Sequence, residues 1–280
     1  MSTVSNAVRK MRRWHAEPVV QDVYDRVLIV DDHGVTRSDT VARTEVNACK
    51  DTIRNRVWDL LDRHGADAEA GSAHGRIPNF IGADAAADRL AELQVWQDAA
   101  VVKAVPDKAQ LPARARALRE GKLVYMAVPK LAQPQPFYLL DPAELTVAPE
   151  EAASSRVAAS IARNIGLDEL RPVDLIICGS VAVNHAGVRL GKGAGYSDIE
   201  VAPLAQAGLI SADTTIVHSL QVVDTDILET RHDFSVDLIV TPDEVITCSP
   251  PRRPAGLHWD DLSAQQIAAM PILQSLQSGR

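Results

Sequence analysis

A strand, a helix and a second strand follow one another between residues 101 and 128, and this order constrains the fold more than any other feature. Residues 101–105 (VVKAV) and 123–128 (LVYMAV) are short apolar runs of strand type. The pattern between them predicts a helix that Asp107 caps, that tolerates Pro112 in its first turn and that ends at Gly121. Because parallel strands need such a crossover helix, the segment predicts a βαβ unit and therefore a layered α/β sheet.

Further strand-type and helix-type patterns occur elsewhere in the chain. The run at 173–178 is almost continuously apolar, which is typical of a strand covered on both faces. Shorter strands are predicted at 137–140, 215–218 and 236–240, and helices at 38–63, 154–164, 199–207 and from 261 onward. We therefore predict an α/β fold with three layers, α/β/α, around a mostly parallel sheet.

The pattern divides the chain into three predicted parts. Residues 1–45 form an N-terminal extension with a basic arm and a polar β-hairpin, residues 46–248 form the α/β domain, and residues 249–280 form a Pro-rich linker with a C-terminal helix. The basic arm lacks an apolar core and a cleavage site, which favours a surface arm or an interface helix over a targeting peptide. A homo-oligomer formed through this extension is one expectation.

Composition excludes several classes of function. Hydrophobic residues make up 46% of the chain, so it is not predominantly disordered, and no run approaches the roughly eighteen apolar residues of a membrane-spanning helix. A net charge of −8 and an aromatic content of 4% argue against nucleic-acid binding. Three cysteines, far apart and in no metal-ligand spacing, favour a reducing, cytoplasmic compartment.

The segment 187–198 (GVRLGKGAGYSD) carries the strongest chemical signal. Its four glycines let the backbone turn tightly and present N–H groups to an anion, and Arg189 and Lys192 add positive charge. The predicted helix that follows would contribute the positive end of its dipole. Asp198, at the start of that helix, could cap it, orient Lys192 or bind Mg²⁺ through water. The segment therefore suits a phosphate group.

A plain structural turn is the alternative interpretation. Glycine-rich connections between a strand and a helix are often only turns, and this segment matches neither of the two common nucleotide-binding glycine motifs. Composition alone leaves both interpretations open.

The same residues resemble a family signature. Residues 189–198 (RLGKGAGYSD) resemble the R-L-G-x-G-x-G-Y-Y-D motif of 5-formyltetrahydrofolate cyclo-ligases, which are also called methenyltetrahydrofolate synthetases. Lys50-x-x-x-Arg54 matches the family's N-terminal K-x-x-x-R pair, and Gln221 and residues 232–237 (HDFSVD) resemble its Q and H-D-x-x-V-D elements. The resemblance extends over about residues 46–247.

A more specific likeness is to the branch called methenyltetrahydrofolate synthetase domain-containing proteins. The hallmarks of this branch are found here, in the same order, at residues 76–80 (RIPNF), 103–108 (KAVPDK), 179–183 (GSVAV), 191–198 (GKGAGYSD) and 217–224 (VHSLQVVD).

The resemblance implies a cyclo-ligase-like three-layer fold, of the kind shared with CoA transferases, that binds ATP and Mg²⁺ around the glycine-rich loop. In these enzymes ATP phosphorylates the formyl oxygen of 5-formyltetrahydrofolate, N10 attacks the activated carbon, and loss of phosphate leaves the 5,10-methenyl bridge. By similarity, the implied nucleotide-binding residues are Lys50, Arg54, Gly191, Gly193, Gly195 and Tyr196. The implied catalytic residues are Arg189, Lys192 and Asp198, and the implied metal ligands are Asp198 and Asp233, although a turn cap is an equal alternative for Asp233.

The sequence departs from the family on the folate side. An acidic E-T pair that helps to hold the pterin is replaced by Ala109-Gln110, and the second tyrosine of Y-Y-D is Ser197. The family's G-x-x-E-P element is absent from residues 129–149. Two hypotheses follow: an enzyme that acts on a formylated folate or on another heterocycle, such as a pterin- or thiamin-related compound, or a non-catalytic module that binds a nucleotide or phosphate and serves regulation.

Overall fold

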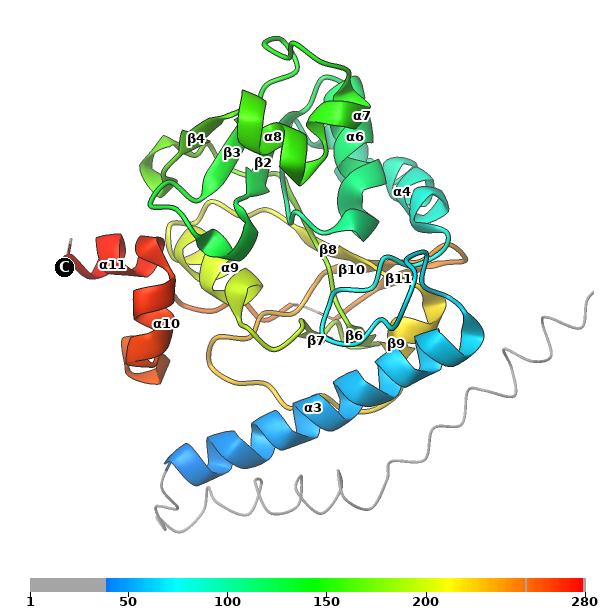
Figure 1. Ribbon diagram of the computed structural model, residues 1–280, viewed down its shortest axis with the longest axis vertical. Coiled ribbons are helices and arrows are strands. Elements are labelled where there is room, and N and C mark those ends of the chain that lie inside the picture. Colours follow the sequence, from blue (N-terminus) through cyan, green and yellow to red (C-terminus); the bar gives the residue numbers. More distant parts are fainter. Residues whose placement is uncertain (1–38, 250, 279–280) are drawn as a thin grey trace, which may run out of the picture.

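The computed structural model describes residues 39–249 and 251–278 of the chain (Figure 1). The basic arm predicted at residues 8–14 and the hairpin predicted at 27–36 lie outside the described residues. The division at residues 45 and 248 and an oligomer formed through the extension stay predictions. Within the described residues, no helix has both the length and the apolar character needed to span a membrane.

Eight strands of the described chain form one mixed sheet with the order β11-β10-β8-β5-β1-β2-β3-β4. The five inner strands from β10 to β2 are parallel to one another, whereas β11, β3 and β4 pair antiparallel at the two edges. Their bounds are β1 Val101–Ala104, β2 Leu123–Ala127, β3 Phe137–Leu140, β4 Arg163–Ile165, β5 Leu175–Cys178, β8 Asp213–Ile216, β10 Leu238–Val240 and β11 Val245–Thr247. The predicted βαβ unit and mostly parallel sheet are confirmed.

Helices cover both faces of this sheet (Figure 1). The alternation of side chains in β1 shows why, because Val102 and Ala104 join one core cluster and Val101 and Val105 join the other. One face carries α4 Ala83–Ala91, α5 Gln94–Asp98, α6 Leu111–Arg119, α7 Pro149–Ala152 and α8 Ser155–Ile161. The other carries α9 Tyr196–Gln206, α10 Ala264–Ala269 and α11 Pro271–Ser278. The three predicted layers are therefore present.

A second, smaller sheet lies outside these layers. It consists of β6 Ala182–Asn184, β7 Arg189–Leu190 and β9 Val222–Val223, and the sequence analysis did not predict it. The long helix α3 Asp39–His64 packs against it through a separate apolar cluster that includes Val57, Leu61 and Leu190 (Figure 1). Short 3₁₀ turns complete the described chain: η1 Lys108–Gln110, η2 Pro129–Leu131, η3 Leu167–Glu169, η4 Ser219–Gln221 and η5 Trp259–Asp261.

Three local predictions were wrong. The helix predicted over 154–164 ends at Ile161, because residues 163–165 pair with β3 as an edge strand. The C-terminal helix is two helices, since the second begins at Pro271, which has no backbone N–H to continue the first. Asp107 precedes the first turn of its helix but makes no side-chain cap.

Arg114 fixes the connection that follows β1. Its side chain is fully buried, and its guanidinium donates to the backbone carbonyls of Val105 at 2.6 Å, Asp107 at 2.9 Å and Ala153 at 2.9 Å. Burial lowers the pKa of Arg114 to about 10, so it remains charged at neutral pH. The side chain thus holds the loop after β1 against α7.

Replacing Arg114 by Met should lower the free energy of unfolding by about 3 kcal/mol, because three buried carbonyl groups would lose their donor. Arg119→Met on the same helix is the matched control. Arg119 is exposed and pairs with exposed Glu150, so its replacement should change stability by no more than about 0.5 kcal/mol. Urea unfolding measures both, and equal effects would contradict this role for Arg114.

Arg253 joins the C-terminal segment to the sheet. Its guanidinium lies 3.1 Å from the carboxylate of Asp213 in β8 and 2.7 Å from that of Asp237, and it donates to the carbonyl of Ser235 at 2.8 Å. Asp213 is fully buried, and burial raises its pKa to about 6 in spite of the opposing effect of Arg253. The folded protein therefore holds a proton on Asp213 more tightly than the unfolded chain does.

This linkage predicts a pH-dependent effect of Asp213→Asn. The stability that wild type gains from protonated Asp213 is fully present below its unfolded pKa and is lost as pH rises through about 6. The difference in free energy of unfolding, variant minus wild type, should therefore rise by about 2 kcal/mol between about pH 4 and about pH 7. Unfolding curves at several pH values test this, and a difference that does not change with pH would contradict it.

Candidate functional site

The site lies where the strand order of the sheet reverses. From β1 the chain adds β2 on one side, and it later adds β5 on the other side of β1. The connections at the carboxyl ends of β1 and β5 therefore lead away from each other and leave a crevice between them. Residues 105–107 follow β1 at this edge, and Gly179 and Ser180 follow β5.

The glycine-rich segment connects β7 of the small sheet to α9. The β6–β7 hairpin separates its glycines Gly191, Gly193 and Gly195 from β5. Gly193 and Gly195 have φ angles of 102° and 70°, which strain any residue with a Cβ atom. Arg54 of α3 donates from Nε to the carbonyl of Gly191 at 2.7 Å, so the helix and the loop support each other.

The first turn of α9 keeps its backbone donors available. Its N-cap residue is Gly195, and no side chain caps the helix. Asp198, one of whose predicted roles was to cap this helix, instead forms an ion pair with Arg189, with 3.1 Å between Nη1 and Oδ1. Uncapped N–H groups at a helix start favour an anionic ligand.

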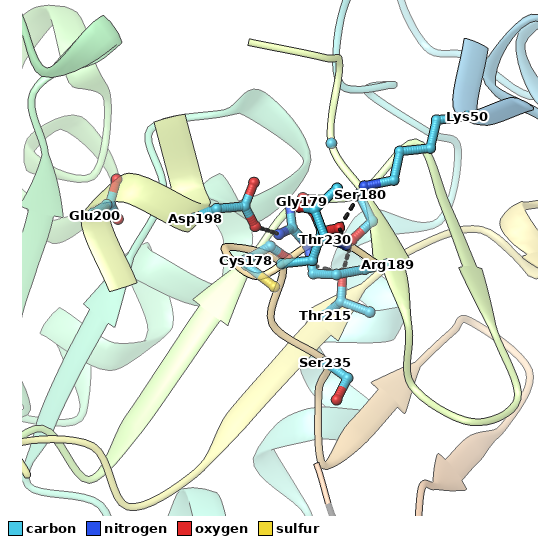
Figure 2. Close-up of polar contacts among 12 residues, drawn as sticks. Lys50, Cys178, Gly179, Ser180, Arg189, Asp198, Glu200, Thr215, Thr230 and Ser235 are labelled. Carbon is cyan, nitrogen blue, oxygen red and sulfur yellow. Dashed lines mark hydrogen bonds and ion pairs between the residues drawn. The ribbon is translucent and has the colours of Figure 1, made fainter. Parts of the chain in front are cut away.

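Arg189 is the central buried cation of the site (Figure 2). Besides Asp198, its guanidinium contacts the Ser180 hydroxyl at 3.3 Å and the Gly179 carbonyl at 3.3 Å, and it lies 4.6 Å from the centre of the Phe234 ring. Burial raises the pKa of Asp198, and the charge of Arg189 opposes that rise. Arg189 therefore ties the end of β5 to the start of α9.

Lys50 and Asp233 form a second ion pair in the site, between Nζ and Oδ2. Asp233 also accepts a hydrogen bond from the backbone N–H of Thr230, as a turn cap does. The nearby charge of Asp233 further raises the pKa of Asp198. Two carboxylates and two cations thus gather beside the glycine-rich loop.

Two cavities meet at this point. The α3 cavity, of about 210 Å³, is lined by Lys50, Arg54, Gly191, Gly193 and Asp233 among others. The β1 cavity, of about 350 Å³, is lined by residues from the loops after β1 and β2 and from the start of α9. Arg189, Gly195 and Asp198 line both cavities. These three residues therefore form a wall that the two cavities share.

The predicted site residues are divided between the two cavities. The α3 cavity brings together Lys50, Arg54, Arg189, Gly191, Gly193, Gly195, Asp198 and Asp233. Lys192 and Tyr196 line the β1 cavity instead, and Lys192 is exposed. Ser197 also lines the β1 cavity, whereas Ala109 and Gln110, at the position of the pterin-binding pair, are buried and line neither cavity.

Sequence analysis missed three acidic residues of the β1 cavity as site residues: Glu69, Asp107 and Glu200. The signal for a site at β1 was the single lysine, Lys103, inside an otherwise apolar strand. Such a buried charge needs a partner of opposite charge, and Glu200 is that partner.

Asp198 and Asp233 fit a magnesium ion only together with phosphate oxygens. Among the described residues, no group of three or more His, Cys, Asp or Glu side chains is placed to hold a metal ion. Mg²⁺ commonly binds through one or two carboxylates plus the phosphates of a nucleotide, and it retains several waters. Both carboxylates line the α3 cavity beside its cations, so the donor set suits this mode.

Comparisons with known proteins show what this chain is similar to. The sequence profile of the 5-formyltetrahydrofolate cyclo-ligase family matches residues 46–242. The methenyltetrahydrofolate synthase domain-containing protein of Bos taurus is 37% identical over 235 residues, which cover 81% of this chain and 62% of that protein. The protein of the same name from Mus musculus is 36% identical over 241 residues, covering 84% and 64%.

A solved structure of Aquifex aeolicus 5,10-methenyltetrahydrofolate synthetase is also similar, with 21% identity, a TM-score of 0.47 and coverage of 75% of this chain and 97% of that one. The chain spans slightly less than two thirds of the length of the curated relatives it matches. The profile match and the identity to these relatives show that the chain belongs to the 5-formyltetrahydrofolate cyclo-ligase family.

Proposed function

We propose that the protein is an ATP- and Mg²⁺-dependent cyclo-ligase that converts 5-formyltetrahydrofolate, or a related formylated heterocycle, with ATP to the cyclised product, ADP and phosphate. One observation carries this proposal: Arg189, Gly195 and Asp198 line both cavities. A nucleotide in the α3 cavity would then meet a substrate in the β1 cavity at these three residues. Transfer of a phosphoryl group between two bound molecules requires such a meeting point.

The α3 cavity has the properties of a phosphate site. Lys50 and Arg54 supply positive charge from α3, Gly191 and Gly193 allow the backbone to approach an anion closely, and α9 begins at the cavity wall. Arg54 already donates to the loop, so this helix and the loop would close around the phosphates together.

The negative charge of the transferring phosphoryl group would be stabilised by Arg189 directly and by Asp198 and Asp233 through Mg²⁺. Mg²⁺, when bound with ATP, would neutralise the phosphate oxygens, and Asp198 and Asp233 are the residues that would hold it. Arg189 is buried and fixed by four contacts, so it would stabilise developing negative charge at the junction without rearranging.

The β1 cavity has the size and walls of a small-molecule site. Its volume of about 350 Å³ lies within the range of known ligand sites. Its apolar walls would contact the faces of a planar ring, and they comprise Ile77, Val105, Pro106, Ala127, Val128, Pro129 and Leu131. Lys192 and Lys130 are exposed at the same cavity, where they would meet an anionic group of the substrate.

The proposed activity is tested by mixing the purified protein with 5-formyltetrahydrofolate, ATP and Mg²⁺ and following the absorbance of the methenyl product. Arg54→Gln should lower kcat/KM for ATP by about 10- to 100-fold, because a charged hydrogen-bond donor is lost from the phosphate site. Arg63→Gln, at the exposed far end of the same helix, should leave kcat/KM within about twofold of wild type.

Two outcomes would contradict the proposal in different ways. If the wild type forms no product with 5-formyltetrahydrofolate and hydrolyses no ATP with a panel of formylated heterocycles, the enzymatic assignment is wrong. Retained binding of ADP and Mg²⁺ in that case would favour the non-catalytic nucleotide-binding module.

A further inference from the structure

The proposed phosphate chemistry leaves the lysine within β1 without a role. Lys103 is fully buried, and the alternation of β1 directs it to the same face as Val101 and Val105, which is the face that α9 covers. Burial lowers its pKa to about 8, which leaves it mainly protonated at neutral pH. A buried ammonium is costly, so its position calls for a specific partner.

That partner is Glu200 of α9, whose Oε1 atom forms an ion pair with Nζ of Lys103. Glu200 is 3% exposed, yet it lines the β1 cavity. Among the described residues, no hydrogen bond to its second oxygen, Oε2, is found. Figure 2 shows Asp198 directed toward Arg189 and Glu200 on the opposite side of the same helix turn. A buried carboxylate with one oxygen held and the other without a partner can accept a hydrogen bond from a ligand.

Asp107 supplies a second acidic group to the same cavity. It follows β1, its backbone carbonyl is held by Arg114, and its side chain makes no hydrogen bond to another described residue. Burial raises the pKa of its carboxyl group, and the charge of Lys192 opposes that rise. The β1 cavity therefore combines buried Glu200 and half-buried Asp107 with the exposed cations Lys130 and Lys192.

This distribution of charge selects one kind of ligand. N–H donors would bind at these two acidic groups, an apolar ring would lie between the walls, and an anionic tail would extend toward the lysines. A heterocycle with an amino group beside a ring N–H, as in a 2-aminopyrimidin-4-one edge, presents donors of this kind. The position at which the family places an acidic pterin contact cannot serve, because Ala109 and Gln110 line neither cavity.

We propose that Glu200 accepts a hydrogen bond from the amino or ring N–H group of the substrate heterocycle and thereby determines the specificity of the cavity, with Lys103 as the positioning residue that holds the Glu200 carboxylate in place. The proposal rests on the proposed function, because it takes the β1 cavity as the substrate cavity.

Equilibrium binding of 5-formyltetrahydrofolate without nucleotide tests the role of Glu200. Glu200→Gln, which keeps the shape and removes the charge, should weaken binding by about 10-fold or more. The affinity for ADP with Mg²⁺ in the α3 cavity is the folding control and should stay within about twofold. Equal affinity of the variant and the wild type for 5-formyltetrahydrofolate would overturn the proposal, as would a wild type that does not bind this compound.

A ligand analogue keeps the test decisive even if the variant fails to fold. The 2-desamino analogue of 5-formyltetrahydrofolate lacks the amino donor, so the wild type should bind it about 10-fold more weakly than the parent compound. A folded Glu200→Gln variant should discriminate between the two compounds much less. A wild type that binds both equally would overturn the proposal.

Lys103 is tested by the discrimination between two ligands. In Lys103→Met, Glu200 loses the contact that holds its carboxylate, so the variant should distinguish 5-formyltetrahydrofolate from its 2-desamino analogue much less than the wild type does. Lys103→Arg should restore the discrimination. A purely structural role of Lys103 would weaken the binding of both compounds equally, and that result would overturn its assignment as a positioning residue.

The two proposals can fail separately. Binding that depends on Glu200, without a methenyl product and without ATP hydrolysis on the panel of formylated heterocycles, would reject the proposed activity and leave this inference standing. Product formation with the same KM for 5-formyltetrahydrofolate in wild type and Glu200→Gln would support the proposed activity and overturn this inference.

Discussion

Two ion pairs fix the start of α9, and the arrangement of the site depends on them. Asp198 pairs with Arg189 of the small sheet, and Glu200 pairs with Lys103 of the large sheet. Asp198 is partly exposed, but the other three charges are buried and are tolerated there only because they are paired. The pairs thus hold the start of α9, with its uncapped N–H groups, between the two cavities.

Segments far apart in the sequence build the α3 cavity. Helix α3 supplies Lys50 and Arg54, the glycine-rich loop supplies its backbone, and the C-terminal segment supplies Asp261, Leu262 and Gln266. The match to the family ends at residue 242, so the C-terminal segment adds a wall beyond the matched region. Arg253, which joins this segment to buried Asp213, therefore links the stability of the sheet to the shape of the cavity.

Local patterns of sequence missed the edge strands β4 and β11 but predicted the five parallel strands of the large sheet, because most of them are apolar runs. The βαβ unit at residues 101–128 and the buried strand β5 are examples. The small sheet escaped prediction because its strands have two or three residues and depend on packing against α3. The motifs predicted which residues gather near the glycine-rich loop, but not their pairing. No local pattern of sequence shows that α9 crosses over β1. This crossing brings Glu200 to Lys103 and places Lys192 on the β1 cavity.

The central claim is that nucleotide and heterocycle occupy two different cavities that meet at Arg189 and Asp198. Calorimetric titration of a non-hydrolysable ATP analogue with Mg²⁺ into protein already saturated with 5-formyltetrahydrofolate tests this claim most directly. Two cavities predict that the analogue still binds, one per chain, with an affinity within about tenfold of that for the free protein. Loss of analogue binding in proportion to the folate concentration would show that the two ligands compete for one site, and it would contradict the account.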